Sequence, residues 1–140
     1  MSTVLNPYIN FRGDAREAME FYRAALGGEL EVATFGEYRA AQDPSENDLV
    51  MHAKLTTRSG LVLMGADRPE RMPYTRGDNI SISLGGEERA ELQGYWDGLA
   101  ERSTVLQPLT ASSWGDSFGM LVDPYGITWL VNIAASAFAS

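Results

Sequence analysis

The side chains that could carry chemistry in this 140-residue chain include one histidine, His52, and no cysteine. The lack of cysteine excludes disulfides, thiolate metal sites, iron–sulfur clusters and a cysteine nucleophile. His52 lies in VMHAKL, a strand-like stretch in which Val50 and Lys54 are expected to share its face. Two interpretations stay open: a pocket histidine that transfers protons near neutral pH, or a structural histidine bonded to a backbone carbonyl. With no identified carboxylate partner, the sequence favours the structural one.

A second candidate region is the C-terminal stretch WGDSFGMLVDPYGITWLVN, residues 114–132. It reads as two strands joined by a tight turn, because Pro124 fixes the backbone early in the turn and Gly126 accepts a positive φ. Asp123 is expected to cap backbone amides of that turn rather than to catalyse. The turn residues of this stretch therefore predict a hairpin and do not by themselves predict a catalytic site.

The same stretch carries aromatic side chains and a further carboxylate. Trp114 and Phe118 could stack on a flat ligand or belong to the core, because aromatic side chains dominate buried area wherever they occur. Trp129 is expected to face the core. Asp116 is a candidate acid at the rim of any pocket.

Bulk properties limit the classes of partner. The formal net charge is −8 and eleven basic residues are scattered along the chain, whereas nucleic-acid affinity rests mainly on Lys and Arg. No apolar run approaches the roughly 20 residues that span a bilayer, and the start lacks a basic and apolar signal segment. We expect a cytoplasmic protein that binds neither nucleic acid nor membrane.

One helix carries several independent signals. Asp14 is expected to cap its first turn, and Glu17 stands three residues later as in a capping box. Gly27 and Gly28 are expected to end it, since glycine accepts the left-handed conformation. Its apolar stripe follows helical spacing: Ala15, Ala18, Met19, Tyr22, Ala25 and Leu26.

The remaining elements repeat one order. A second helix follows Gly85-Gly86, with the stripe Leu92, Tyr95, Trp96 and Leu99. The predicted strands are 6–11, 29–35, 49–57, 61–65, 79–84, 104–109, 117–122 and 127–133. In strand 79–84 the apolar face is expected to hold Ile80, Ile82 and Leu84. Each half is thus strand, helix and three strands, which predicts an internal duplication.

Six pieces of the chain carry a family resemblance: NPYINF with EAMEFYRAALGG, VMHAKL, LVLMGAD, NISISL and the C-terminal stretch. In this order they resemble the vicinal oxygen chelate superfamily, which includes glyoxalase I, bleomycin-resistance proteins and extradiol dioxygenases. The PhnB-like branch, also labelled 3-demethylubiquinone methyltransferase-like, is the most similar.

The resemblance implies an α+β fold of two βαβββ modules that form a cup-shaped curled mixed sheet, with the helices on the convex side. It implies a single domain over 1–140: module one at about 4–67, a linker at about 68–78 and module two at about 79–133. One strand face would carry the polar lining that a pocket needs, from Tyr8, Asn10, Asn79, Ser81 and Ser83. A homodimer is also implied.

The resemblance further implies four positions at which metal-using members hold His, Glu or Gln. In this chain they fall at Tyr8 or its neighbours, Met64, Asn79 and Leu130. Methionine prefers soft ions and leucine offers no donor, whereas catalytic zinc or iron takes imidazole and carboxylate. We therefore expect no catalytic metal and no cofactor.

The function expected is a small-molecule binder of unassigned reaction, which holds a hydrophobic or aromatic compound in the cup. The alternative is a metal-dependent lyase, isomerase or dioxygenase, and whether any reaction is catalysed stays open. A methyltransferase is a third hypothesis, poorly supported because no glycine-rich nucleotide loop follows the first strand. The ligand-binding residues expected are Tyr8, Asn10, His52, Met64, Asn79, Ser81, Trp114, Phe118 and Leu130.

Overall fold

A computed structural model of the chain describes residues 2–135. The chain divides into two compact units, Met1–Thr75 and Arg76–Ser140. Elements of the first unit are β1 Tyr8–Phe11, α1 Ala15–Leu26, β2 Glu29–Thr34, the short 3₁₀ turn η1 Pro44–Glu46, β3 Val50–Thr56 and β4 Val62–Asp67. Elements of the second unit are β5 Ser81–Gly86, α2 Arg89–Ala100, β6 Thr104–Ala111, β7 Ser117–Val122 and β8 Thr128–Ile133. Among the described residues no helix is long and apolar enough to cross a membrane.

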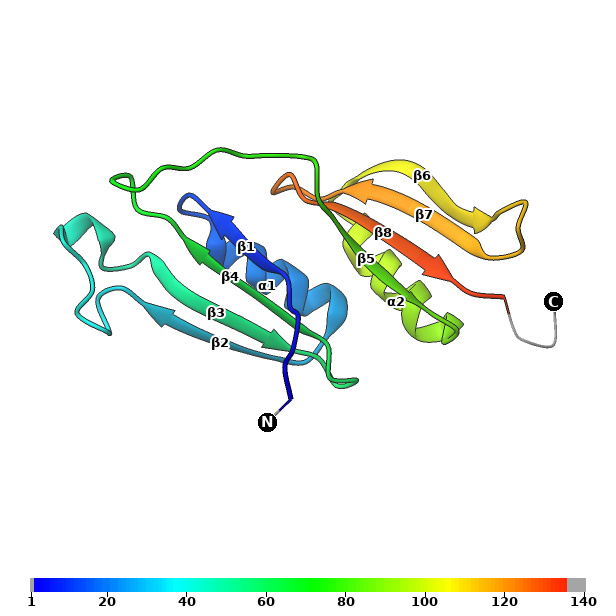
Figure 1. Cartoon of the computed structure of the whole chain (residues 1–140), viewed down its shortest axis with the longest axis horizontal. Coiled ribbons are helices and arrows are strands. Elements are labelled where there is room, and N and C mark those ends of the chain that lie inside the picture. Colours follow the sequence, from blue (N-terminus) through cyan, green and yellow to red (C-terminus); the bar gives the residue numbers. More distant parts are fainter. Residues whose placement is uncertain (1, 136–140) are drawn as a thin grey trace. The chain divides into compact units, whose positions relative to one another are not determined.

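Each unit is a four-stranded mixed sheet with one helix against one face (Figure 1). The strand order is β1-β4-β3-β2 in the first sheet and β5-β8-β7-β6 in the second. In both, the first strand pairs parallel with the last, and the other pairs are antiparallel. The prediction of two βαβββ modules in an α+β fold is confirmed.

The start of α1 corrects one prediction. The Asp14 side chain makes no capping hydrogen bond. The cap comes instead from Asp67 at the end of β4, whose Oδ1 accepts from Gly13 N at 2.8 Å and from Ala15 N at 3.0 Å. Its Oδ2 accepts from Val50 N at 2.9 Å. One carboxylate therefore accepts hydrogen bonds from backbone N–H groups at the start of the helix and from the first N–H group of β3.

The end of α1 follows the prediction. Gly27 has φ +77° and its N–H donates to Arg23 O at 2.7 Å. Gly28 follows with φ +102°, and a Cβ there would overlap Thr56 O. Glycine is therefore required twice, once for the turn and once for the close approach of β3.

In the first unit, the helix-side face of the sheet is apolar. Ala53, Leu55 and Leu63 are buried there, with Met19 and Tyr22 of α1 also buried. Val50 belongs to this core as well, with 1% of its surface exposed, so the expectation that it shares a face with His52 is wrong. The register of β2 and β3 shifts between Ala33 and Thr34, and such a bulge reverses the alternation beyond it.

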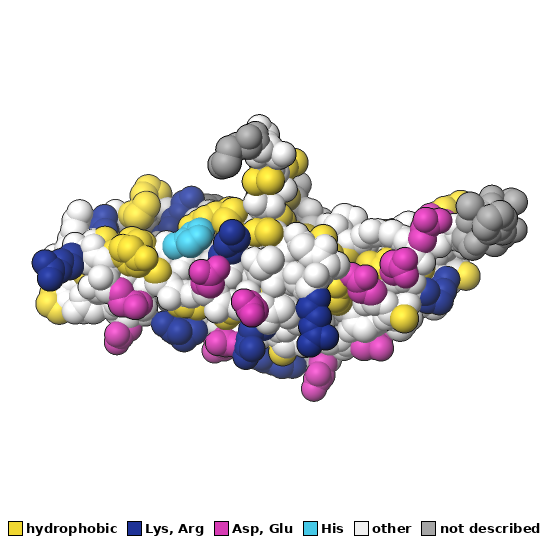
Figure 2. Space-filling view, turned by 90° about the horizontal axis from the view of Figure 1, so that it is seen from below, with side chains coloured by type: hydrophobic (Ala, Val, Ile, Leu, Met, Phe, Trp, Pro, Cys, Tyr) yellow, Lys and Arg dark blue, Asp and Glu magenta, His cyan; other side chains and the backbone are white. Residues whose placement is uncertain are grey.

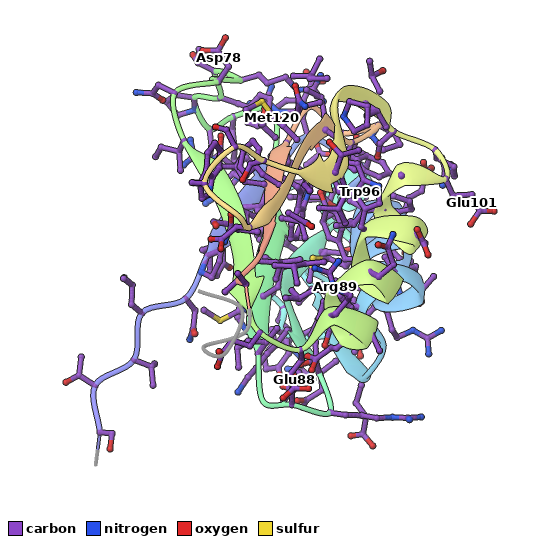
Figure 3. All side chains as sticks on the ribbon, turned by 90° about the vertical axis from the view of Figure 1, so that its right-hand side faces the viewer. Asp78, Glu88, Arg89, Trp96, Glu101 and Met120 are labelled. Atoms are coloured by element: carbon purple, nitrogen blue, oxygen red, sulfur yellow. The ribbon has the colours of Figure 1, made fainter. Side chains whose placement is uncertain are left out.

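In the second unit, α2 lies so close to the sheet that β7 needs a glycine. A Cβ on Gly119 would meet Trp96 Cη2 at 2.8 Å and Leu109 Cα at 2.9 Å. Trp96, on α2, faces the strands and is buried (Figure 3). Ile80 is 81% exposed and lies before β5 begins at Ser81, so its expected place on the apolar face is a further error.

Candidate functional site

Each sheet has a second face that its own helix does not cover, and this is called its uncovered face here. In the first unit this face presents Tyr8, Asn10, Lys54 and Met64, by strand alternation and register. Tyr8 pairs with Met64, which in turn pairs with Lys54 of β3. Lys54 stands opposite Glu31 of β2, so the row ends in a pair of opposite charges.

His52 belongs to the same face, and its imidazole meets Tyr8. The Tyr8 hydroxyl lies 3.3 Å from His52 Nδ1, and the two ring centroids are 5.8 Å apart. Partial burial raises the pKa of the Tyr8 phenol above its ordinary value, so the phenol stays protonated at neutral pH. Figure 2 shows the histidine at the surface of its unit, beside hydrophobic and basic side chains. The partner found for this imidazole is thus a side-chain hydroxyl rather than a backbone carbonyl.

The uncovered face of the second unit is more apolar. Leu130 of β8 pairs with Met120 of β7 on one side and with Ser83 of β5 on the other. The neighbouring row runs from Gly85 through Asn132 to Phe118. The members of these rows on β7 and β8 alternate with buried residues of the same strands. The face thus combines thioether, aliphatic and aromatic surface with small polar groups.

Trp114 lies in the turn before β7 and borders this face. Its indole is 65% exposed, and its ring centroid is 6.4 Å from that of Phe118 at an interplanar angle of 54°. This tilted geometry is typical of an attractive aromatic pair. Trp114 and Phe118, the two aromatic residues considered for stacking from the sequence, therefore contact each other, and Trp114 stays accessible to solvent.

Asp116 holds this corner together. Its Oδ2 accepts from Asn132 Nδ2 at 3.0 Å and its Oδ1 from Ala135 N at 2.8 Å. Hydrogen bonds from Asn132 first, then from the Ala135 amide and the Trp114 side chain, hold the pKa of Asp116 below its usual 3.8. A general acid needs a proton near neutral pH, so Asp116 is suited to positioning its neighbours rather than to acid catalysis.

Three other residues singled out from the sequence take up structural or peripheral places. Asn79 is exposed and lies two residues before β5, outside the strand on which it was expected. Ser81 is the first residue of β5 and pairs with Thr128. Trp129 is 1% exposed, as predicted, and its Nε1 donates to Asp123 Oδ2 at 2.9 Å.

The donor set does not fit the metal chemistry of the superfamily. At the corresponding positions the first unit offers a phenol from Tyr8 and a thioether from Met64. The second offers the amide of Asn79 and, at Leu130, no donor atom. Within residues 2–135 no three His, Asp or Glu side chains gather in a way that could hold a metal ion. No step of any reaction is therefore assigned to a metal at these positions.

Sequence reasoning missed two residues of the second uncovered face, Met120 and Asn132. Both could have been found by strand alternation, since Met120 is two residues from Phe118 and Asn132 two from Leu130. The other omission, Asp67, had no local signal because its partners are 17 to 54 positions away.

Known proteins share both the sequence and the fold. The family model described as 3-demethylubiquinone-9 3-methyltransferase matches residues 3–132. The crystal structure of protein PA1353 from Pseudomonas aeruginosa is 36% identical, with a TM-score of 0.79 over 96% of this chain and 100% of that one. Protein YjdN of Escherichia coli (strain K12) is 26% identical over 140 residues, 92% of this chain and 94% of that protein.

A more distant match shows the fold alone. A glyoxalase/bleomycin resistance protein/dioxygenase family enzyme from Burkholderia phytofirmans PsJN is 12% identical, with a TM-score of 0.60 over 91% of this chain and 95% of that one. The match to residues 3–132 and the 36% identity together show the family. This chain belongs to the family described as 3-demethylubiquinone-9 3-methyltransferase.

Proposed function

We propose that the protein binds a small hydrophobic or aromatic molecule, without a catalytic metal, on the uncovered face of its second sheet. One observation carries the proposal: Phe118, Met120 and Leu130 share a face that α2 does not cover, and Trp114 stands beside Phe118. Ligand pockets are mostly apolar surfaces with a few placed polar groups. Ser83 and Asn132 supply such groups in the adjoining rows.

The first uncovered face is a second region for contact with a ligand. Tyr8, Asn10, His52 and Met64 place a phenol, an amide, an imidazole and a thioether on one surface. His52 is the group there that can exchange a proton near neutral pH. A His52→Ala variant with unchanged ligand affinity and unchanged turnover of any substrate found would leave this histidine a structural role only.

The proposal is tested by calorimetric titration of the full chain with menadione, as a flat apolar probe, and by thermal-shift screening of aromatic antibiotics and quinones. Trp114→Ala should weaken binding roughly tenfold or more, because stacking on an aromatic side chain contributes about 1–3 kcal/mol. Tyr38→Ala is a matched control, since Tyr38 is an aromatic residue of similar exposure, 64% against 65%, in the other unit. Equal affinity in both variants would contradict the assignment to this face.

The alternative function is a metal-dependent lyase, isomerase or dioxygenase of the same superfamily. It is disfavoured by the donor set at Tyr8, Met64, Asn79 and Leu130, described above. Metal-stimulated turnover of a glutathione adduct or a catechol would establish it instead. The methyltransferase in the family description is a separate hypothesis, and binding of S-adenosylmethionine in the same titration would support it.

A further inference from the structure

Beside the aromatic pair, the second uncovered face carries one polar group with a fixed orientation, the side-chain amide of Asn132. Its Nδ2 donates to Asp116 Oδ2 at 3.0 Å. A carboxylate only accepts hydrogen bonds, so the nitrogen end of the amide must face Asp116 and the oxygen end must face away. A rotation of the amide that exchanges its nitrogen and oxygen would lose this hydrogen bond.

The oxygen end of that amide is open. Among the described residues, Asn132 Oδ1 has no hydrogen-bond partner, and no buried side-chain N or O atom lacks one. The Oδ1 atom is therefore reachable from outside. It is a hydrogen-bond acceptor with a set direction, on a surface that is otherwise apolar.

The neighbouring position on β5 leaves room for an occupant. Gly85 pairs with Asn132 in the parallel ladder, on the uncovered side, and Phe118 is the partner of Asn132 on β7. A Cβ built on Gly85 would meet only Asn132 O, at 3.6 Å, which is ordinary contact. The strand thus presents bare backbone beside Asn132, and nothing in its conformation requires glycine there.

We infer that this site takes a planar aromatic molecule that carries an N–H or O–H donor on its ring. The ring packs against Trp114 and Phe118 over Gly85, and its donor bonds to Asn132 Oδ1. Asp116 is a positioning residue, because it holds the amide and the Trp114 indole without itself meeting the ligand. This inference rests on the proposed function and narrows the ligand class from aromatic to donor-bearing aromatic.

The test compares 2-naphthol with 2-methoxynaphthalene, which has the same ring but no donor, by calorimetry on the full chain at neutral pH. The wild type should bind 2-naphthol roughly tenfold more tightly, as one hydrogen bond of about 1.4 kcal/mol requires. Asn132→Leu should remove this preference while 2-methoxynaphthalene still binds. Trp114→Ala should weaken both probes by a similar factor.

Gly85→Val tests the position of the ring. It should abolish binding of both probes, because the new side chain fills the space beside Asn132, while the thermal midpoint stays near that of the wild type. Thr104→Val is the matched control, since it puts the same side chain at an exposed position of the same sheet, opposite Val122 instead of Asn132. Binding should survive there.

The outcomes separate the two proposals. Equal affinity for both probes in the wild type, or a preference for 2-naphthol that survives Asn132→Leu, would overturn the inference that the ligand carries a donor. The proposed function, binding of an aromatic molecule on this face, would still stand. If neither naphthalene probe nor menadione binds, the inference and the proposed function of this face are overturned together. A Gly85→Val variant that turns a dimer into a monomer would show that a second copy of the chain occupies the face, and would also overturn the inference.

Discussion

At the scale of single residues, two buried aspartates fix the two units in similar ways. Asp67 accepts three backbone N–H groups around the start of α1 and β3. Asp123 accepts from Tyr125 N at 2.8 Å, from Ile127 N at 3.0 Å and from the Trp129 indole. Both carboxylates are 4% exposed. Buried charges of this kind persist because several donors replace the lost water.

Asp123→Ala should therefore destabilise the second unit by about 3 kcal/mol, since hydrogen bonds to a charged group contribute most and leave buried donors unsatisfied when removed. All three tryptophans lie in this unit, so urea unfolding followed by tryptophan fluorescence reports on it. Asp78→Ala, at an exposed position, should change stability by less than about 0.5 kcal/mol. Equal effects of the two substitutions would contradict the role given to Asp123.

Asp116 makes a pH-dependent contribution whose sign follows from its lowered pKa. The folded-state pKa lies below the ordinary 3.8, chiefly through the hydrogen bond from Asn132. The stabilisation is therefore complete above the unfolded pKa and is lost as pH falls through the folded one. The stability gap between wild type and Asp116→Asn should be constant from pH 7 to about 5 and should shrink below 3.8. Urea titrations across this range measure it, and a gap that grows on acidification would contradict the assignment.

Local backbone structure could be predicted from the sequence, whereas contacts between residues far apart in the chain could not. The turn at Asp123 and Gly126 follows from local backbone preferences, and Gly126 has the expected positive φ of 89°. The cap at α1 was misassigned to Asp14 because Asp67, 53 positions further along, reaches the Gly13 and Ala15 amides at the helix start once β4 pairs with β1. Tyr8 and His52 meet for the same reason, through sheet order rather than sequence spacing.

At the scale of elements, the close packing of α2 on the second sheet depends on Gly119. Gly119→Ala should cost about 1–3 kcal/mol, because its Cβ would overlap the Trp96 ring and the β6 backbone. Gly94→Ala, within α2 and with nothing within 4 Å of the new Cβ, should stabilise by about 1 kcal/mol. Fluorescence-detected unfolding distinguishes the two signs. A Gly119→Ala variant as stable as wild type would show that the ring moves aside freely.

Element boundaries were predicted within a few residues, and face assignments failed where alternation broke. Helix α1 buries the stripe that its spacing indicates, with two differences: Ala25 is only half-buried, and Phe21 is buried as well. In β3 the bulge turns Val50 into the core, and a bulge leaves no mark in a sequence that alternates on both sides of it. Asn79 and Ile80 read as strand because they continue the alternation of β5, although the strand begins later.

At the scale of the whole molecule, the chain exposes large apolar side chains on an outer strand of the second sheet. Val105 is 42% and Leu106 55% exposed on β6, an edge strand of its sheet. Such surface favours association, and we propose a homodimer. Light scattering should give about twice 15.3 kDa, and Leu106→Lys should lower this mass at equal concentration. A monomer mass for the wild type at tens of micromolar would refute the homodimer.

The last prediction concerns metal, on which chemistry depends in the vicinal oxygen chelate superfamily that the sequence resembles. The four corresponding positions carry a phenol, a thioether, an amide and an aliphatic chain, and this donor set does not suit zinc, iron, nickel or manganese. Untagged protein should therefore retain no stoichiometric metal by inductively coupled plasma mass spectrometry, and excess chelator should leave the affinity for menadione unchanged. His52 alone among the described residues could supply an imidazole. His52→Ala is therefore the control that identifies an ion held loosely by this side chain. Stoichiometric metal lost in a Met64→Ala variant would instead place a metal site among these residues and restore the enzymatic alternative.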